Sequence, residues 1–464
     1  MFHHHHSLRA VVIALTTCAT VPGIALAADS DWRSWRGPDG SGYVADSNPP
    51  IKWSAISNIK WKVAIPGSAH ASPIVMGDRV YVMTAVEVEP AAGETPTAPE
   101  IQAQEQQEEP RGRGGRGGGR GGRGGAAAPK PQRFIVMALD RESGEVVWQT
   151  AVNEAAPHEG THGTSTFAAG SPVTDGEFLY AFFGSYGIYC LDLDGTVMWH
   201  KDLGDMRIRG EFGEGASPAV HDGVVVVPWD HEGDSFIVAL DASTGEEVWR
   251  RERDEPSSWA TPIVVTIDDV EQVILPGTNA TIGYNFKSGE EIWRCSGMTS
   301  NVIPTPIIDG NRLYLMSGFR GSSAQAINLE GATGDISGTA AVLWEFDRGT
   351  PYVPSPLLAN GRLYFLRSNS GVISCLDAAT GEPHYLGERL ADAPNVYASL
   401  VGAGNAIYVC SREGEVVVIE DGPTPNILAT NSLGEGINAT PAIAGDELFI
   451  RTDHHLFCIA ATEE

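Results

Sequence analysis

The densest group of side chains that could bind a metal is the pentapeptide Asp230-His231-Glu232-Gly233-Asp234. Carboxylate oxygens on a glycine-containing loop are ligands that Ca²⁺ prefers. The spacing matches no established calcium motif, and polar residues that cap a hairpin explain it more simply. Asp230, Glu232 and Asp234 are therefore candidate metal ligands, with hairpin capping as the favoured alternative.

A second set of polar and aromatic side chains lies in loops between short β-rich runs, and its members are candidates for binding a cofactor. They are His70, His162, Glu214, Trp259, Asn301, Arg320 and Tyr397. The two histidines are explained more simply as residues that form hydrogen bonds within loops than as general bases. We find no Ser/His/Asp constellation and no phosphate-binding loop, so the sequence assigns no catalytic residue.

The segments between these loops form an internal repeat. Eight times a Ser-Pro or Thr-Pro step, once replaced by Ser-Leu, opens a short apolar run, a turn and a second apolar run. The steps begin at Ser72, Ser171, Ser217, Thr261, Thr305, Ser355, Ser399 and Thr440. Apart from one interval that contains an insert, the period is about 40–50 residues, the range of propeller blades. The sequence therefore predicts an all-β fold, an eight-bladed β-propeller with four-stranded blades.

The clearest unit, residues 216–250, contains four β-rich runs, the last of which carries Trp249. Asp241 and Gly245 precede this run with the spacing of a tight hairpin turn, in which the Asp side chain caps the turn and Gly takes a left-handed conformation. A tryptophan follows the corresponding turn in most other units. A large apolar side chain in an outer strand most simply packs between neighbouring blades, so we interpret this series as structural.

The eighth unit lacks a fourth strand, because the chain ends soon after its third run at residues 456–459. Residues 58–65 resemble a fourth strand and carry Trp61. We therefore predict that this N-terminal segment completes the last blade and closes the ring. Closure protects the sheet edges that an open array would expose.

The candidate side chains are expected to share one face of the propeller. Strand direction alternates within a blade, so the loop leading into the first strand (here called the leading loop) and the loop between the second and third strands open on the same side. Function in repeat folds tends to lie on one such loop face. The leading loops into the second and third blades are the longest, so that side is the predicted rim of a site.

The N-terminus has the pattern of an export signal. Arg9 precedes an apolar run that ends in Ala25-Leu26-Ala27, which indicates a signal peptide over residues 1–27 and a periplasmic or secreted protein. The sequence leaves open whether Cys18 is lipidated and where His3 to His6 originate. No later stretch reaches the roughly 20 apolar residues that a membrane span needs.

Residues 28–52 are predicted to form an N-terminal extension, and residues 53–464 the propeller. Within the first blade, residues 86–131 form an insert that is first rich in Pro and Glu and then in Arg and Gly. This composition cannot bury a core, so we expect the insert to be disordered.

The composition excludes some classes of partner and site. The chain has 59 acidic and 31 basic residues and a formal charge of −28, which opposes a general nucleic-acid role. The cysteines after the signal peptide are odd in number and widely spaced, which indicates neither a disulfide framework nor a zinc site. We interpret them as small buried apolar residues.

The segment Ala239 to Trp249, with the pattern Ala-Leu-Asp-x-x-Thr-Gly-Glu-x-x-Trp, resembles the pyrroloquinoline-quinone (PQQ) propeller repeat. The resemblance extends over nearly all of the chain from Trp53 onward. Residues 31–38 also resemble the start of exported bacterial PQQ-like proteins. Two groups with different activities use this repeat: quinoprotein alcohol dehydrogenases, and a non-enzymatic lipoprotein subunit of the outer-membrane β-barrel assembly machinery.

The resemblance implies two functions. The favoured one is a binding or scaffolding module for a protein or polymer partner in the cell envelope. The alternative is a PQQ- and Ca²⁺-dependent alcohol or sugar dehydrogenase, for which the resemblance nominates Glu214 and Asn301 at the metal and Asp230 as the base. Those dehydrogenases carry a disulfide between adjacent cysteines over the quinone, and this chain has no adjacent pair.

Overall fold

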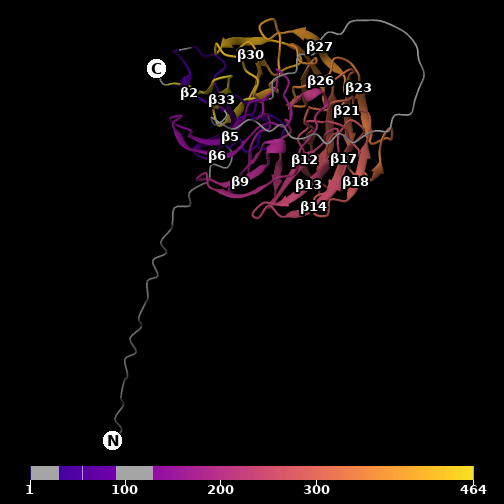
Figure 1. Cartoon of the computed structure of the whole chain (residues 1–464). Helices are drawn as coiled ribbons and strands as arrows, with labels where there is room; N and C mark the ends of the chain where they lie inside the picture. Colours follow the sequence, from indigo (N-terminus) through magenta and orange to yellow (C-terminus); the bar gives the residue numbers. More distant parts are fainter. Residues whose placement is uncertain (2–30, 55, 90–128, 463–464) are drawn as a thin grey trace, which may run out of the picture.

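The computed structural model describes residues 1, 31–54, 56–89 and 129–462. Their strands form eight sheets that follow one another around a ring, which is the predicted eight-bladed β-propeller (Figure 1). The predicted signal peptide and all but the ends of the predicted disordered insert lie outside the described residues. Among the described residues, no helix is long and apolar enough to cross a membrane.

Each blade is a four-stranded meander whose first strand faces the central channel. Blade 1 comprises β3 (Ile74–Met76), β4 (Arg79–Glu87), β5 (Gln132–Asp140) and β6 (Val146–Ala155), and blade 2 comprises β7 (Val173–Thr174), β8 (Phe178–Phe182), β9 (Ile188–Asp192) and β10 (Val197–Lys201). Blade 3 comprises β11 (Ala219–His221), β12 (Val224–Trp229), β13 (Phe236–Asp241) and β14 (Glu247–Glu252), and blade 4 comprises β15 (Ile263–Ile267), β16 (Val270–Leu275), β17 (Thr281–Asn285) and β18 (Glu291–Cys295).

The second half of the ring repeats this arrangement. Blade 5 comprises β19 (Ile307–Asp309), β20 (Arg312–Ser317), β21 (Ser323–Asn328) and β23 (Val342–Phe346), and blade 6 comprises β24 (Leu357–Ala359), β25 (Arg362–Leu366), β26 (Val372–Asp377) and β27 (Pro383–Arg389). Blade 7 comprises β28 (Val401–Ala403), β29 (Ala406–Cys410), β30 (Glu415–Glu420) and β31 (Ile427–Ser432), and blade 8 comprises β32 (Ala442–Ala444), β33 (Glu447–Arg451), β34 (His455–Ile459) and β2 (Ile59–Ala64).

The ring is closed by the N-terminal strand, as predicted. β2 pairs antiparallel with β34, and Trp61 lies opposite Cys458 in this pairing. Two short strands extend other blades: β22 (Gly334–Asp335) runs parallel to the outer strand β18, and β1 (Tyr43–Val44) runs parallel to the inner strand β28. The five described cysteines are all buried and unpaired, which confirms their interpretation as apolar strand residues.

The repeated Ser/Thr-Pro step forms a ring of hydrogen bonds between blades. The backbone N–H of this Ser or Thr donates to the hydroxyl oxygen of its counterpart in the next blade, for example Ser72 to Ser171 at 2.9 Å. Six of the eight neighbouring pairs in the ring form this hydrogen bond. The pairs Thr261–Thr305 and Thr440–Ser72 are the exceptions. The most regular sequence feature thus holds the blades in register.

The repeated tryptophan and the turn glycine of the next blade form a second contact between blades. The Trp199 indole N–H donates to the carbonyl oxygen of Ala242 at 2.9 Å, and Gly245 lies against the ring. A Cβ added to Gly245, whose φ is +71°, would approach the Trp199 ring to 2.6 Å. The same indole-to-carbonyl bond is made by Trp61, Trp148, Trp249 and Trp344. The structural interpretation of these tryptophans is therefore confirmed.

Trp293 departs from this pattern. Its indole N–H donates to the Gln272 side chain within its own blade at 2.8 Å. The following blade carries an insertion in the corresponding turn, and part of that insertion forms β22 beside β18.

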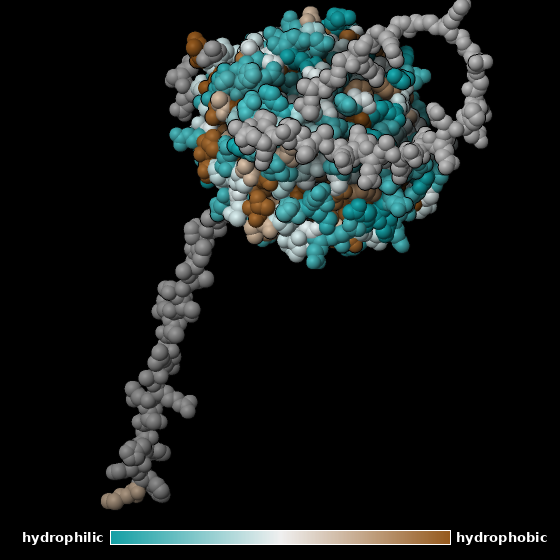
Figure 2. Space-filling view, in the orientation of Figure 1, coloured by the Kyte–Doolittle hydropathy of each residue, from teal (hydrophilic) through white to brown (hydrophobic). Residues whose placement is uncertain are grey.

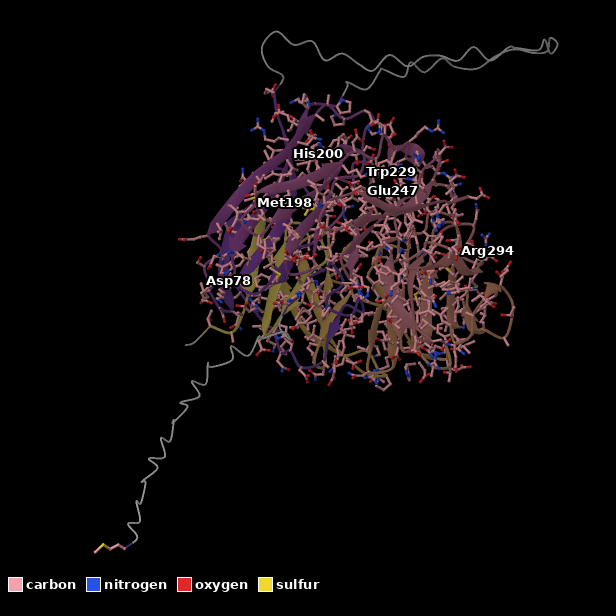
Figure 3. All side chains as sticks on the ribbon, turned by 90° about the horizontal axis from the view of Figure 1, so that it is seen from below. Asp78, Met198, His200, Trp229, Glu247 and Arg294 are labelled. Carbon is pink, nitrogen blue, oxygen red and sulfur yellow. The ribbon has the colours of Figure 1, made fainter. Side chains whose placement is uncertain are left out.

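Residues on either side of the interblade tryptophans face solvent. Met198 and His200, both on β10, are exposed on either side of Trp199 (Figure 3). This alternation follows from the two-residue period of a strand. On the face shown in Figure 2, most residues are hydrophilic and the hydrophobic ones occur in small separate groups. This surface agrees with the high net charge of the chain.

The N-terminal extension crosses the channel at the end opposite the leading loops. Trp32 pairs with Val75 of blade 1, and the Arg36 guanidinium donates to the carbonyl oxygens of Pro356 and Leu400 in blades 6 and 7. Burial lowers the pKa of Arg36 to about 9, but it still carries its charge at neutral pH. The extension is thus attached to blades 1, 6 and 7.

Candidate functional site at the channel mouth

A cavity on the leading-loop face forms a cup at the mouth of the central channel. Its volume is about 260 Å³, and its walls include Ser72, Ser171 and four other members of the Ser/Thr ring. Trp35 lines this cup and also a second cavity of about 240 Å³ on the far side of the ring. The Trp35 indole therefore separates the two cavities and forms the floor of the cup.

The rim of the cup is aromatic and comes from several blades. Phe319 and Tyr352 stack with their ring centroids 4.8 Å apart, and the Arg412 guanidinium lies 4.4 Å from the Tyr397 ring. On the opposite wall, the Trp259 indole N–H donates to the carbonyl oxygen of Gly213 at 2.6 Å. These contacts fix the aromatic rings before any ligand binds.

Among the residues that the structure describes, no charged side chain lines the cup. None of its lining residues is Asp, Glu, Lys or Arg, although the chain carries a net charge of −28. The lining includes His70, and burial, aided by the charges of Arg412 and Arg451, lowers the pKa of His70 to about 4. This histidine is therefore neutral at physiological pH. The cup suits an uncharged group with apolar or aromatic faces.

The leading loop of blade 2 crosses part of the mouth. His162 Nδ1 lies 2.8 Å from the Thr164 hydroxyl in this loop, and the His162 ring packs edge-on against Phe212. The Tyr397 hydroxyl from the leading loop of blade 7 lies 3.4 Å from the Thr164 hydroxyl. The long loop that the sequence analysis assigned to the rim thus covers one side of the cup.

The structure brings together four of the seven residues nominated for ligand binding. His70, His162, Trp259 and Tyr397 all line the cup.

The other three nominated residues lie elsewhere. The Glu214 carboxylate accepts hydrogen bonds from Ser185. Asn301 is buried with only 1% of its surface exposed, and the Arg320 guanidinium packs over the ring of Phe319. None of these three lines the cup.

The acidic loop in blade 3 makes contacts within the protein. Asp230 forms a buried ion pair with Arg253 at 2.8 Å, and Glu232 pairs with Arg209 at 3.0 Å. Glu232 also accepts a hydrogen bond from the Ser257 hydroxyl. Two of the three carboxylates nominated for calcium therefore already have cationic partners. Cation binding on this loop and the alternative, hairpin capping, both stay predictions.

Trp35 is the main residue of the cup that sequence analysis missed. It belongs to the non-repeating extension, so the repeat gave no reason to place it in the channel. His158 and Glu159 were missed as well, and the structure places them near Glu214 but outside the cup. The only feature of the sequence that pointed to these two residues was the unusual length of the leading loops into blades 2 and 3.

Comparison with known proteins identifies related sequences and folds. A family model described as outer membrane protein assembly factor BamB matches residues 132–382 and 234–463. The outer membrane protein assembly factor BamB of Yersinia pestis is 24% identical over 337 residues, which cover 68% of this chain and 77% of that protein.

Solved structures share the fold at low sequence identity. A europium-containing methanol dehydrogenase matches with a TM-score of 0.62 and 11% identity, over 93% of this chain and 98% of that one. BamB from Moraxella catarrhalis matches with a TM-score of 0.51 and 15% identity, over 70% of this chain and 88% of that one. At these identities the structural matches show the propeller fold alone.

Proposed function

Because the chain belongs to the family of outer membrane protein assembly factor BamB, we propose that it is an exported binding propeller that holds a partner protein at the channel mouth. The partner presents an extended segment and inserts an aromatic or aliphatic side chain into the cup. The observation that carries this proposal is the uncharged, aromatic-rimmed cup in an otherwise strongly acidic protein.

The chemistry of the cup supports a protein ligand. The centres of protein interfaces are depleted in charged residues and enriched in aromatic ones, and their energetic anchors occupy desolvated pockets. Phe319, Tyr352, Tyr397 and Trp259 provide such a surface, and their contacts within the protein reduce the entropy lost on binding. The related BamB of Yersinia pestis carries the description of an assembly factor, which agrees with a role in binding proteins.

The residues of the cup do not fit PQQ with Ca²⁺. The quinone carries carboxylate groups that pair with Lys or Arg, and Ca²⁺ sites are built around Asp or Glu, whereas no Lys, Arg, Asp or Glu lines the cup. Of the nominated metal ligands, Glu214 is bound by Ser185 and Asp230 by Arg253. We therefore derive no redox step for this chain.

Site-specific photo-crosslinking tests the proposal. A photoreactive phenylalanine analogue replaces Phe319 at the rim in one variant and Leu386, an exposed residue on the outer strand β27, in the control. We expect a discrete protein adduct from cell-envelope material with the Phe319 variant and none with the Leu386 variant. Equal adducts from both positions, no adduct, or an adduct to a polysaccharide would overturn the proposal.

A reconstitution measurement addresses the dehydrogenase alternative separately. We expect the purified chain, incubated with PQQ and Ca²⁺ and then dialysed, to retain no quinone absorbance. Retained absorbance together with dye-linked alcohol oxidation would favour the enzyme over the binding module.

A further inference from the structure

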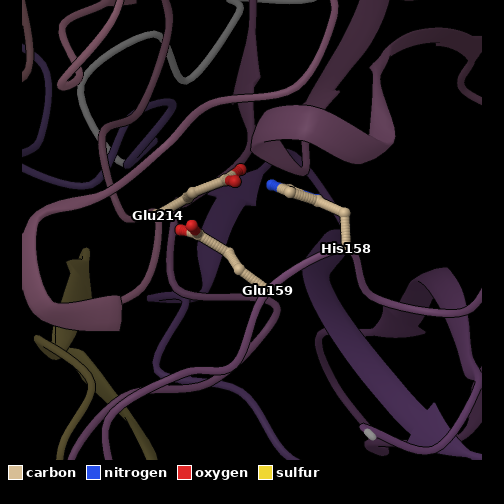
Figure 4. A group of neighbouring side chains, drawn as sticks. All are labelled: His158, Glu159 and Glu214. Carbon is tan, nitrogen blue, oxygen red and sulfur yellow. The ribbon is translucent and has the colours of Figure 1, made fainter. Parts of the chain in front are cut away.

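Three side chains that bind metals in other proteins converge outside the cup. His158 and Glu159 lie in the leading loop of blade 2, and Glu214 lies in the leading loop of blade 3 (Figure 4). One ligand atom from each of the three lies within 4.8 Å of the others. Figure 4 shows the two carboxylates and the imidazole pointing toward one another from two segments of the chain.

Each of these side chains is oriented by a group outside the cluster. Glu214 accepts hydrogen bonds from the backbone N–H and the hydroxyl of Ser185, at 2.5 and 2.6 Å. Glu159 accepts one from the backbone N–H of Ile208 at 3.0 Å, and His158 Nε2 donates to the carbonyl oxygen of Met206 at 2.7 Å. Metal ligands are typically held in place by such outer partners.

The two carboxylates have no cationic partner. Among the described residues, neither Glu159 nor Glu214 forms an ion pair with Lys or Arg. Asp205 is a further acidic residue beside His158, with its carboxylate 3.9 Å from Nδ1. Partly buried carboxylates without a countercharge are costly, and a bound cation would offset that cost.

A small cavity beside the cluster has room for one ion or water. Its volume is about 10 Å³, and Glu159, Thr161, Tyr186 and Glu214 are among the residues that line it. The Thr161 hydroxyl is buried there and has no hydrogen-bond partner. Such a volume corresponds to about one water-sized sphere, and the Thr161 hydroxyl is free to contact an ion or water held there.

We propose that His158, Glu159 and Glu214 bind a divalent transition-type cation of the Zn²⁺ class. An imidazole nitrogen combined with carboxylate oxygens suits Zn²⁺ and related ions, whereas Ca²⁺ prefers a shell made of oxygen ligands alone. The cation joins the leading loops of blades 2 and 3. It thereby holds in place the loop that carries Thr164 to the channel mouth. This site is independent of the ligand proposed for the cup.

Calorimetric titration of the chain with Zn²⁺, after removal of metal by a chelator, tests this site. His3 to His6 are replaced by serine in all samples, because these imidazoles would themselves bind Zn²⁺. We expect about one Zn²⁺ per chain, with an affinity at least about tenfold weaker in Glu159→Gln and His158→Ala. Ca²⁺ under the same conditions should give no comparable binding.

The matched controls lie on the same two loops. His162→Ala removes an exposed histidine four residues after His158, and Glu211→Gln removes an exposed carboxylate three residues before Glu214. We expect both controls to bind Zn²⁺ as the parent does and to show the same rise in melting temperature on adding Zn²⁺. Glu159→Gln should lose that rise while it keeps the parent's circular dichroism spectrum.

Three results would overturn the proposal. They are no Zn²⁺ binding by the parent chain, equal binding by Glu159→Gln and His158→Ala, or a preference for Ca²⁺ over Zn²⁺. Because Glu159→Gln retains an oxygen that can accept the Ile208 N–H, a loss of binding in this variant is separable from misfolding.

Discussion

The Tyr397 hydroxyl lies 3.4 Å from the Thr164 hydroxyl, and this contact joins the leading loops of blades 7 and 2 across the channel mouth. The two residues are 233 positions apart in the chain. The contact shows that the cup is shaped by loops that meet over the channel as well as by the blades beneath them.

Removing this contact should loosen the loop without unfolding the ring. Tyr397→Phe keeps the aromatic ring and its contact with Arg412, but loses the hydroxyl. We expect a loss of at most about 1 kcal/mol in unfolding free energy and faster hydrogen exchange at residues 161–166. Tyr385→Phe is the control, because the Tyr385 hydroxyl is buried without a partner on an outer strand. Unchanged exchange in Tyr397→Phe would show that the contact does not hold the loop.

The hydrogen-bonded Ser/Thr ring gives a matched pair of substitutions. The Thr440 hydroxyl accepts the Ser399 N–H at 2.9 Å, whereas the Thr305 hydroxyl is buried without a partner. Thr440→Val leaves a buried N–H unsatisfied and should cost about 1–2 kcal/mol, whereas Thr305→Val should be nearly neutral or slightly stabilising. Denaturant midpoints measure both, and equal losses would contradict a structural role for the ring.

The contact between Trp199 and Gly245 gives a second pair. Gly245 and Gly223 have φ values of +71° and +73°, so alanine is strained to a similar degree at both positions. A Cβ at Gly245 meets the Trp199 ring, but a Cβ at Gly223 meets nothing within 4 Å. We expect Gly223→Ala to cost about 1 kcal/mol. Gly245→Ala should lower the thermal midpoint clearly further than Gly223→Ala, and similar midpoints would show that the ring moves aside freely.

The half-buried His70 should make stability depend on pH. Its pKa falls from 6.5 to about 4 in the folded state, chiefly through burial, so the unfolded state binds more protons between these values. Stability should therefore fall as the pH drops from about 6.5 to about 4, by about 3 kcal/mol from this residue. His70→Gln should flatten that part of the profile in urea unfolding measured across this range. A proton resonance of His70 that titrates near pH 6.5 in the folded protein would contradict the expectation.

The fold was predictable because its packing repeats. Most Ser/Thr-Pro steps and most turn-plus-Trp units form the same contact with the next blade, so the period of the sequence reflects the period of the structure. The strand that carries Trp61 could be recognised as the missing fourth strand of the eighth blade, because it has the same sequence pattern as the other fourth strands and precedes the first unit. The common face of the loops followed from strand direction alone.

The site was only partly predictable because its decisive features do not repeat. Glu214 was singled out as a loop residue, but nothing in the sequence showed that it turns toward Ser185 and away from the channel. His158 and Glu159 meet Glu214 only because two irregular loops fold against each other. Trp35 reaches the channel because the residues around it are attached to blades 1, 6 and 7.

The pairing of β2 with β34 has a consequence for how the protein folds. Trp61 lies opposite Cys458, so the last blade joins strands from nearly opposite ends of the chain. During synthesis the N-terminal strand emerges early and has no partner until almost the whole chain has been made. Pairing of such distant segments costs loop-closure entropy before it contributes stability, which slows folding. The early strand is thus exposed for longest to aggregation or to capture by chaperones.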